Sequence, residues 1–202
     1  MFFVGLDLGQ KQDFSAVAVV ERERQRLAFM PPVYACLRVR YLERMPLGTP
    51  YTNVVERVRQ MMQHPMMLAW GCRLVVDATG VGAAVVDLLR SARLPCGLTA
   101  VTITAGEQAH SRGGAWHVPK KDLLAVLQVL LEDKQLKICG KLREATTLVR
   151  ELTDIRRYER AGGRVGMGAE GSGEHDDLAI AVALACWQAR RPEIGYRTQP
   201  LF

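Results

Sequence analysis

The chain has 202 residues, of which 49% are hydrophobic and 24% are charged, a composition that is typical of a globular protein and argues against global disorder. Lysine and arginine number 27 against 21 aspartates and glutamates, and the resulting net charge of +6 permits a polyanionic partner without proving one. No apolar run approaches the roughly 18 residues of a membrane-spanning helix, and the five cysteines are widely spaced without a CxxC motif. This cysteine pattern argues against a disulfide framework or zinc ribbon and favours a reducing, intracellular compartment.

The first half of the chain predicts strands before helices. Apolar, β-branched segments predict three antiparallel strands at residues 2–8, 14–20 and 33–42, the first two joined by a short polar turn. Residues 52–62 then have helical spacing. A short buried strand at 74–76, a helix opened by glycines at 81–92 and a further strand at 98–104 follow.

The second half predicts mostly helices. Residues 105–116 lack periodicity and predict a loop or an exposed hairpin, and residues 158–173, with six glycines, predict the same. Between and after them, the chain predicts helices over 122–133, 142–155 and 175–190, and a short edge strand at 136–138. The whole order predicts an α/β fold whose central mixed sheet has three antiparallel strands followed by parallel strands, flanked by helices. We expect one domain over residues 1–191 and a loosely ordered tail over 192–202.

Acidic residues stand at matching ends of the buried elements. Asp7 ends the first strand, Asp77 ends the strand at 74–76, and Asp176 and Asp177 begin the last, apolar helix. Because ligands gather beyond strand ends in α/β sheets, Asp7 and Asp77 converge if the first and fourth strands are neighbours. Packing of the final helix would bring Asp177 or Asp176 to the same place. Such carboxylates repel one another unless they are protonated or bridged by cations, and an all-oxygen cluster suits Mg²⁺ or Mn²⁺. Two such ions about 4 Å apart can activate a water and stabilise a leaving oxygen in phosphodiester cleavage.

Each acidic residue also has a structural interpretation. Asp7 suits a turn after a strand, and Asp77 suits a helix-capping turn. Asp176 and Asp177 can favour a helix N-terminus electrostatically. The joint occurrence of these positions favours a shared site over separate explanations.

Three segments resemble RNase H-like nucleases, and more narrowly the nuclease domain of the phage terminase large subunit. The opening hairpin at residues 4–20 contains Val-Gly-Leu-Asp-Leu-Gly, residues 74–82 read Leu-Val-Val-Asp-Ala-Thr-Gly-Val-Gly, and residues 173–181 contain His-Asp-Asp at a helix start. The resemblance covers nearly the whole chain. It implies an RNase H-like fold and a two-metal endonuclease, using Mg²⁺ or Mn²⁺, that cuts double-stranded DNA during phage genome packaging. Little sequence preference is expected, because no segment resembles a base-reading helix or finger.

The resemblance also implies roles for individual residues. The catalytic and metal-binding carboxylates are Asp7, Asp77, Asp177 and Asp176, the last being a direct ligand or a group behind the ligands. Asp13 falls where some terminases keep an additional acidic residue. His175 orients a ligand or a phosphate, or is only a polar residue at the helix start.

Basic residues in or beside the glycine-rich segments suit phosphate contacts. The candidate DNA-binding residues are Arg112, Lys120, Lys121 and Arg164. The implied partners are double-stranded DNA and the packaging motor: an ATPase domain or chain, the small terminase and the portal, with no membrane, in the host-cell cytoplasm. The chain has no GxxxxGK[ST] phosphate loop, so we expect an excised nuclease domain or a stand-alone relative.

Three alternative functions remain at this point. A Holliday-junction resolvase has a related fold, although resolvases resemble the family with a glutamate where this chain has Asp77. An actin-like sugar kinase or ATPase shares the Gly-Leu-Asp-Leu-Gly motif but needs a second glycine-rich phosphate motif that this sequence lacks. A non-catalytic basic DNA-binding module is the non-enzyme alternative, and the intact acidic set weighs against it.

Overall fold

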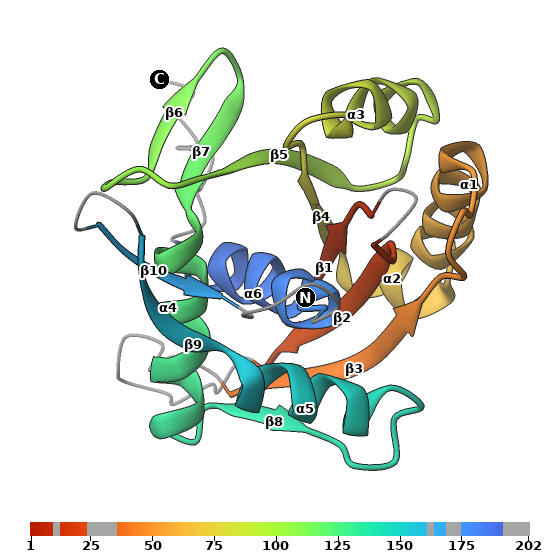
Figure 1. The fold of residues 1–202 in the computed structure, drawn as a ribbon. Helices are drawn as coiled ribbons and strands as arrows, with labels where there is room; N and C mark the ends of the chain where they lie inside the picture. Colours follow the sequence, from red (N-terminus) through yellow and green to blue (C-terminus); the bar gives the residue numbers. More distant parts are fainter. Residues whose placement is uncertain (10–12, 24–35, 161–163, 169–174, 192–202) are drawn as a thin grey trace, which may run out of the picture.

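The computed structural model describes residues 1–9, 13–23, 36–160, 164–168 and 175–191. In this part of the chain, a large mixed sheet forms the centre of the molecule (Figure 1). Its strands are β1 (Phe2–Asp7), β2 (Ala16–Arg22), β3 (Leu37–Arg44), β4 (Cys72–Asp77), β5 (Gly97–Thr104), β6 (His110–Arg112), β7 (Ala115–Pro119) and β8 (Leu136–Ile138). Their order across the sheet is β6-β7-β5-β4-β1-β2-β3-β8.

The strand directions confirm the expected mixed sheet. β1, β2 and β3 are successive antiparallel neighbours, and β4 pairs with β1 in parallel. β5 and β7 continue the parallel half, and β8 closes the other edge beside β3. The segment that lacked periodicity forms the hairpin of β6 and β7, which projects from one end of the sheet (Figure 1).

Helices cover both faces of the sheet. They are α1 (Tyr51–Met62), α2 (Pro65–Trp70), α3 (Gly82–Ser91), α4 (Lys120–Glu132), α5 (Ala145–Asp154) and α6 (Asp177–Arg190). A two-stranded hairpin of β9 (Arg156–Arg160) and β10 (Arg164–Gly168) lies near α4 (Figure 1). No helix in the described part of the chain is long and apolar enough to cross a bilayer.

Strand alternation divides the core into two layers. In β1, Phe3 packs with the α4–α5–α6 layer, whereas Phe2, Val4 and Leu6 pack with α1, α2 and α3. This is the period of two that a strand buried on both faces requires. Residues of β1 with odd numbers, Asp7 included, therefore lie on the α6 face of the sheet.

Gly5 allows α6 to lie directly against β1. A Cβ atom at Gly5 would come within 1.8 Å of the carbonyl oxygen of Ala181 in α6. The helix itself is almost entirely buried, which explains its apolar composition. Close contact at Gly5 brings the start of α6 to the end of the sheet where β1 ends.

The boundaries differ from the sequence prediction in a few places. The six-residue helix α2 was not predicted, because it is too short to show a helical period; it begins after His64, whose Nδ1 accepts a hydrogen bond from Met66 N. The helices predicted from residues 142 and 175 begin at Ala145 and Asp177. Residues 33–35 of the third predicted strand, and the tail at 192–202, lie outside the described residues.

Candidate active site

Asp7 and Asp77 lie side by side at the carboxyl ends of two adjacent parallel strands. Leu6 of β1 is the register partner of Val76 in β4, so the next residue of each strand is an aspartate. Their carboxyl groups lie close enough for each to influence the pKa of the other. The first and fourth strands are therefore neighbours, which is the condition under which the sequence predicted that Asp7 and Asp77 converge.

A tight turn after β4 orients Asp77. Its Oδ1 accepts hydrogen bonds from the backbone N–H of Thr79, at 2.8 Å, and from the Thr79 hydroxyl. Thr79 Oγ1 in turn accepts a hydrogen bond from the N–H of Ile103 in β5, at 2.9 Å. Helix α3 begins only after Val81, whose side chain makes no capping hydrogen bond. Asp77 thus takes part in turn chemistry without capping the helix, and one carboxylate oxygen is fixed by the turn.

Asp176 and Asp177 bring two more carboxylates from the other side of the site. Asp176 precedes the first turn of α6 but makes no side-chain capping hydrogen bond. Its Oδ2 lies 2.6 Å from Lys120 Nζ, and Asp177 Oδ2 lies 3.1 Å from Arg44 Nη2. Each of the two acidic side chains therefore has a cation as its partner.

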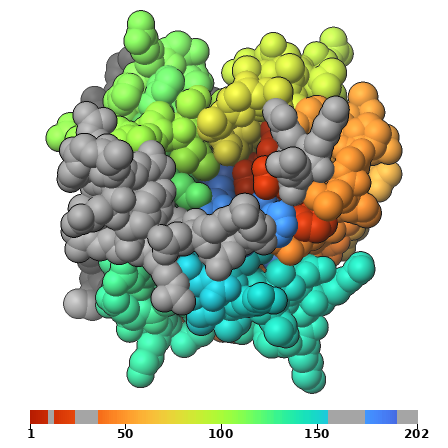
Figure 2. Space-filling model, viewed as in Figure 1, coloured from red at the N-terminus to blue at the C-terminus, as the bar shows by residue number. Residues whose placement is uncertain are grey.

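A polar cavity joins these elements. It has a volume of about 200 Å³ and is lined by Asp7, Leu8, Gly9, Asp13, His175, Asp176 and Asp177. In Figure 2, the red segment of the first strands and the blue segment of α6 meet near the centre of the face shown. The cavity contains five of the six predicted catalytic, metal-binding and supporting residues, and the sixth, Asp77, contacts Asp7.

Burial and mutual repulsion raise the pKa values of the carboxyl groups. The pKa of Asp7 is well above its ordinary value, first because of burial and then because Asp77, Asp177 and Asp176 are nearby. Burial also raises the pKa of Asp77, against the hydrogen bonds from Thr79, and that of Asp177, against the positive charge of Arg44. A cation placed among these groups would favour their ionised forms.

The donor set fits a hard divalent cation. Asp13, His175 and Asp177 each offer a ligand atom, and these three atoms lie within 4.8 Å of one another. Among the described residues, the predicted trio of Asp7, Asp77 and Asp177 does not meet that distance criterion.

Sequence reasoning missed two residues behind this site, Arg44 and Glu151. Arg44 Nη2 lies 3.0 Å from Glu151 Oε1 as well as close to Asp177. Burial raises the pKa of Glu151 to about 7, although the N–H of Ala179 and the charge of Arg44 oppose the shift. The sequence did contain a signal for Glu151. It lies three residues after the buried Leu148 in α5, and therefore places a charged side chain on the apolar face of that helix.

The predicted DNA-binding residues have different surroundings. Lys120 lies within the site through its contact with Asp176, whereas Lys121 pairs with Glu107. Arg112 is exposed on β6. Arg164 begins β10, and its side chain lies outside the described residues.

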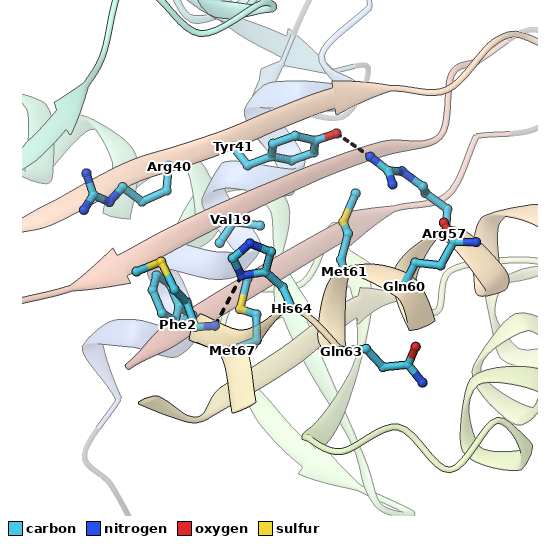
Figure 3. A pocket seen from close by; sticks show the side chains of 11 residues that line it. Phe2, Val19, Arg40, Tyr41, Arg57, Gln60, Met61, Gln63, His64 and Met67 are labelled. Carbon is cyan, nitrogen blue, oxygen red and sulfur yellow. Dashed lines mark hydrogen bonds between the residues drawn. The ribbon is translucent and has the colours of Figure 1, made fainter. Parts of the chain in front are cut away.

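A larger cavity, of about 540 Å³, lies elsewhere, between the sheet and helices α1 and α2 (Figure 3). Its described lining contains methionines such as Met61 and Met67 and no carboxylate. In Figure 3, Arg57 lies beside Tyr41 and donates a hydrogen bond to its hydroxyl, at 2.7 Å. The carboxylates that could hold a divalent cation therefore line the smaller cavity and not the larger one.

Comparisons with known proteins support the resemblance drawn from the motifs. No protein-family model matches the chain. The large terminase subunit of Thermus phage G20c is 26% identical over 198 residues, which are 98% of this chain and 33% of that protein. The chain thus spans about a third of the length of this curated relative.

Solved structures give the same result for the fold. The large terminase nuclease of thermophilic phage G20c, with bound magnesium, superposes with a TM-score of 0.68 at 25% identity, covering 93% of this chain and 81% of that one. The nuclease domain of the large terminase of bacteriophage SPP1, with bound Mn, has a TM-score of 0.55 at 12% identity, covering 93% and 85%, and is similar in fold. The predicted resemblance to terminase nuclease domains and the predicted RNase H-like fold are confirmed.

Proposed function

We propose that this chain is the nuclease part of a phage DNA-packaging terminase, a metal-dependent endonuclease that cuts double-stranded DNA with little sequence preference. The observation that carries the proposal is the contact of Asp7 with Asp77 at adjacent strand ends, facing the start of α6. The similarity to terminase nucleases with bound magnesium or cobalt supports it.

The carboxylates would hold two divalent ions, Mg²⁺ or Mn²⁺. Asp77, Asp177 and Asp176 all raise the pKa of Asp7, so Asp7 lies among the carboxylates that would hold these ions. When bound, such ions lower the pKa of a water and stabilise the leaving oxygen of a phosphodiester. The turn at Thr79 keeps Asp77 oriented while this occurs.

Asp13 and His175 complete the polar side of the cavity. His175 Nδ1 lies 3.8 Å from Asp13 Oδ1 and 3.7 Å from Asp177 Oδ2. At these distances the imidazole would orient either carboxylate, or its N–H would donate a hydrogen bond to a phosphate oxygen. Its ring also meets Phe14 edge-on, with centroids 5.1 Å apart, which restricts its movement.

Basic residues of the two hairpins and of the start of α4 would hold the DNA backbone. Arg112 belongs to the hairpin of β6 and β7, and Lys121 lies in the first turn of α4, directly after that hairpin. Arg164 belongs to the hairpin of β9 and β10. Phosphate contacts of this kind position a duplex without reading its sequence. The proposed protein partners are an ATPase domain or chain, the small terminase and the portal of a packaging motor.

Plasmid cleavage tests the proposal. Supercoiled plasmid is incubated with the protein and Mg²⁺ or Mn²⁺, with EDTA as the control and with no ATP. We expect nicked and linear DNA in the metal lanes only, with cut ends spread over many sequences. Absence of cleavage with either ion contradicts the proposal, and preferential cutting of a four-way junction over a linear duplex favours a resolvase.

A further inference from the structure

Arg44 is held between two buried carboxylates. Its Nη2 lies 3.0 Å from Glu151 Oε1 and 3.1 Å from Asp177 Oδ2. The exposed fractions of the Arg44, Glu151 and Asp177 side chains are 17%, 4% and 8%. Since water screens these charges poorly, the three groups interact more strongly than a surface ion pair would.

Other contacts fix this arrangement in place. Arg44 Cζ lies 4.5 Å from the centroid of the Phe14 ring, a cation–π contact. Glu151 Oε2 accepts a hydrogen bond of 2.8 Å from the N–H of Ala179, in the first turn of α6. Glu151 is thereby tied both to Arg44 and to the helix that carries Asp177.

We propose that Glu151 is a positioning residue of the nuclease site, which shares Arg44 with Asp177 and so weakens the ion pair with which a divalent ion at Asp177 competes. The inference rests on the proposed function, which makes Asp177 a metal ligand. A metal at Asp177 competes with Arg44 for the same carboxylate. Because the charge of Glu151 draws Arg44 toward itself, removing that charge strengthens the competing ion pair and weakens metal binding.

Glu151→Gln separates this role from a structural one. Glutamine has nearly the same shape and keeps a carbonyl oxygen for the N–H of Ala179, but it has no negative charge. Isothermal titration with Mn²⁺ alone at pH 8 measures the affinity while Glu151 is ionised, since its pKa is about 7. We expect the dissociation constant to rise on the order of tenfold, as for other groups that support metal ligands.

The matched control is Glu23→Gln, the same chemical change in the exposed ion pair between Glu23 and Arg38. It should leave the Mn²⁺ affinity unchanged. The effect of Glu151→Gln should also disappear in an Arg44→Met background, because Glu151 acts through Arg44. Arg44→Gln serves instead if Arg44→Met does not fold.

The possible results are distinguishable. An affinity of Glu151→Gln equal to that of the parent overturns the inference, and so does an equal loss with and without Arg44. If the parent binds no Mn²⁺, or if Asp177→Asn binds it as the parent does, the proposed function itself fails. Urea unfolding of each variant confirms that the metal affinities are those of folded protein.

Discussion

Lys120 of α4 and Asp176, the residue before α6, form an ion pair in which Nζ lies 2.6 Å from Oδ2. The positive charge of Lys120 also opposes the upward pKa shifts of Asp7 and Asp77. The adjacent Lys121 pairs instead with Glu107, a largely exposed residue of the loop after β5. Two neighbouring lysines that the sequence presents as equivalent DNA contacts thus have different electrostatic surroundings.

Single substitutions should separate the two lysines. Lys120→Ala removes a cation from the carboxylate cluster, so Mn²⁺ binding, measured by calorimetry, should become several-fold tighter. Lys121→Ala should leave Mn²⁺ affinity unchanged and reduce the salt dependence of DNA binding by a slope of about 1, as the loss of one phosphate contact requires. Equal Mn²⁺ affinities in the two variants would count against a role for Lys120 within the site.

Asp77→Asn should separate stability from activity. Asparagine keeps an oxygen for the hydrogen bonds from Thr79, while the loss of one charge relieves repulsion at Asp7, so the metal-free variant should be as stable as the parent or more stable. Saturating Mn²⁺ should raise the melting temperature of the parent by about 5–10 °C, and that of the variant much less. Plasmid cleavage by the variant should be lost.

The result that contradicts this prediction is equally specific. If Asp77→Asn is strongly destabilised without metal, and Mn²⁺ never shifts the melting temperature of the parent, the main role of Asp77 is in the turn with Thr79. Thr79→Val is a useful companion variant, because it removes the hydroxyl but keeps the charge of Asp77. It should retain a metal-induced shift.

The sequence predicted elements and strand-end carboxylates more fully than it predicted contacts between distant segments. The convergence of Asp7 and Asp77 could be predicted because each ends a short apolar strand, a local pattern. Arg44 and Glu151 were missed because their pairing joins β3 to α5, which are more than a hundred residues apart. Helix α2 was missed for a different reason, since its six residues make fewer than two turns and give no measurable period.

Gly5→Ala tests whether the packing of α6 on β1 positions the site. The new Cβ would meet the carbonyl oxygen of Ala181 at 1.8 Å, so the helix must move. We expect a loss of about 3 kcal/mol in the free energy of unfolding, measured with urea. Because Asp177 begins the same helix, Mn²⁺ binding should weaken as well.

Gly140→Ala is the matched control, because nothing lies within 4 Å of a Cβ placed there. It should change neither the unfolding free energy nor the affinity for Mn²⁺ by a measurable amount. A Gly5→Ala variant with the stability of the parent would mean that β1 and α6 separate without cost. The close approach would then have no part in positioning Asp177.

The final prediction concerns the dependence of stability on pH in the absence of metal. Burial raises the pKa of Glu151 from 4.5 to about 7 in the folded protein. The protonated form is therefore favoured by folding, and the associated stability is fully present below pH 4.5 and lost as the pH rises through about 7. The glutamine of Glu151→Gln does not titrate, so this variant does not lose that stability as the pH rises.

Urea unfolding in EDTA between pH 4.5 and 8 measures the difference. The free energy of unfolding of the parent, relative to Glu151→Gln, should fall over this range by at most about 3 kcal/mol, the limit set by the pKa difference. The direction is the opposite of that for a carboxylate stabilised mainly by its ion pair, whose contribution grows with rising pH. Parallel curves for parent and variant, or a difference that grows with pH, would mean that Arg44 and the N–H of Ala179 outweigh burial and keep Glu151 ionised throughout.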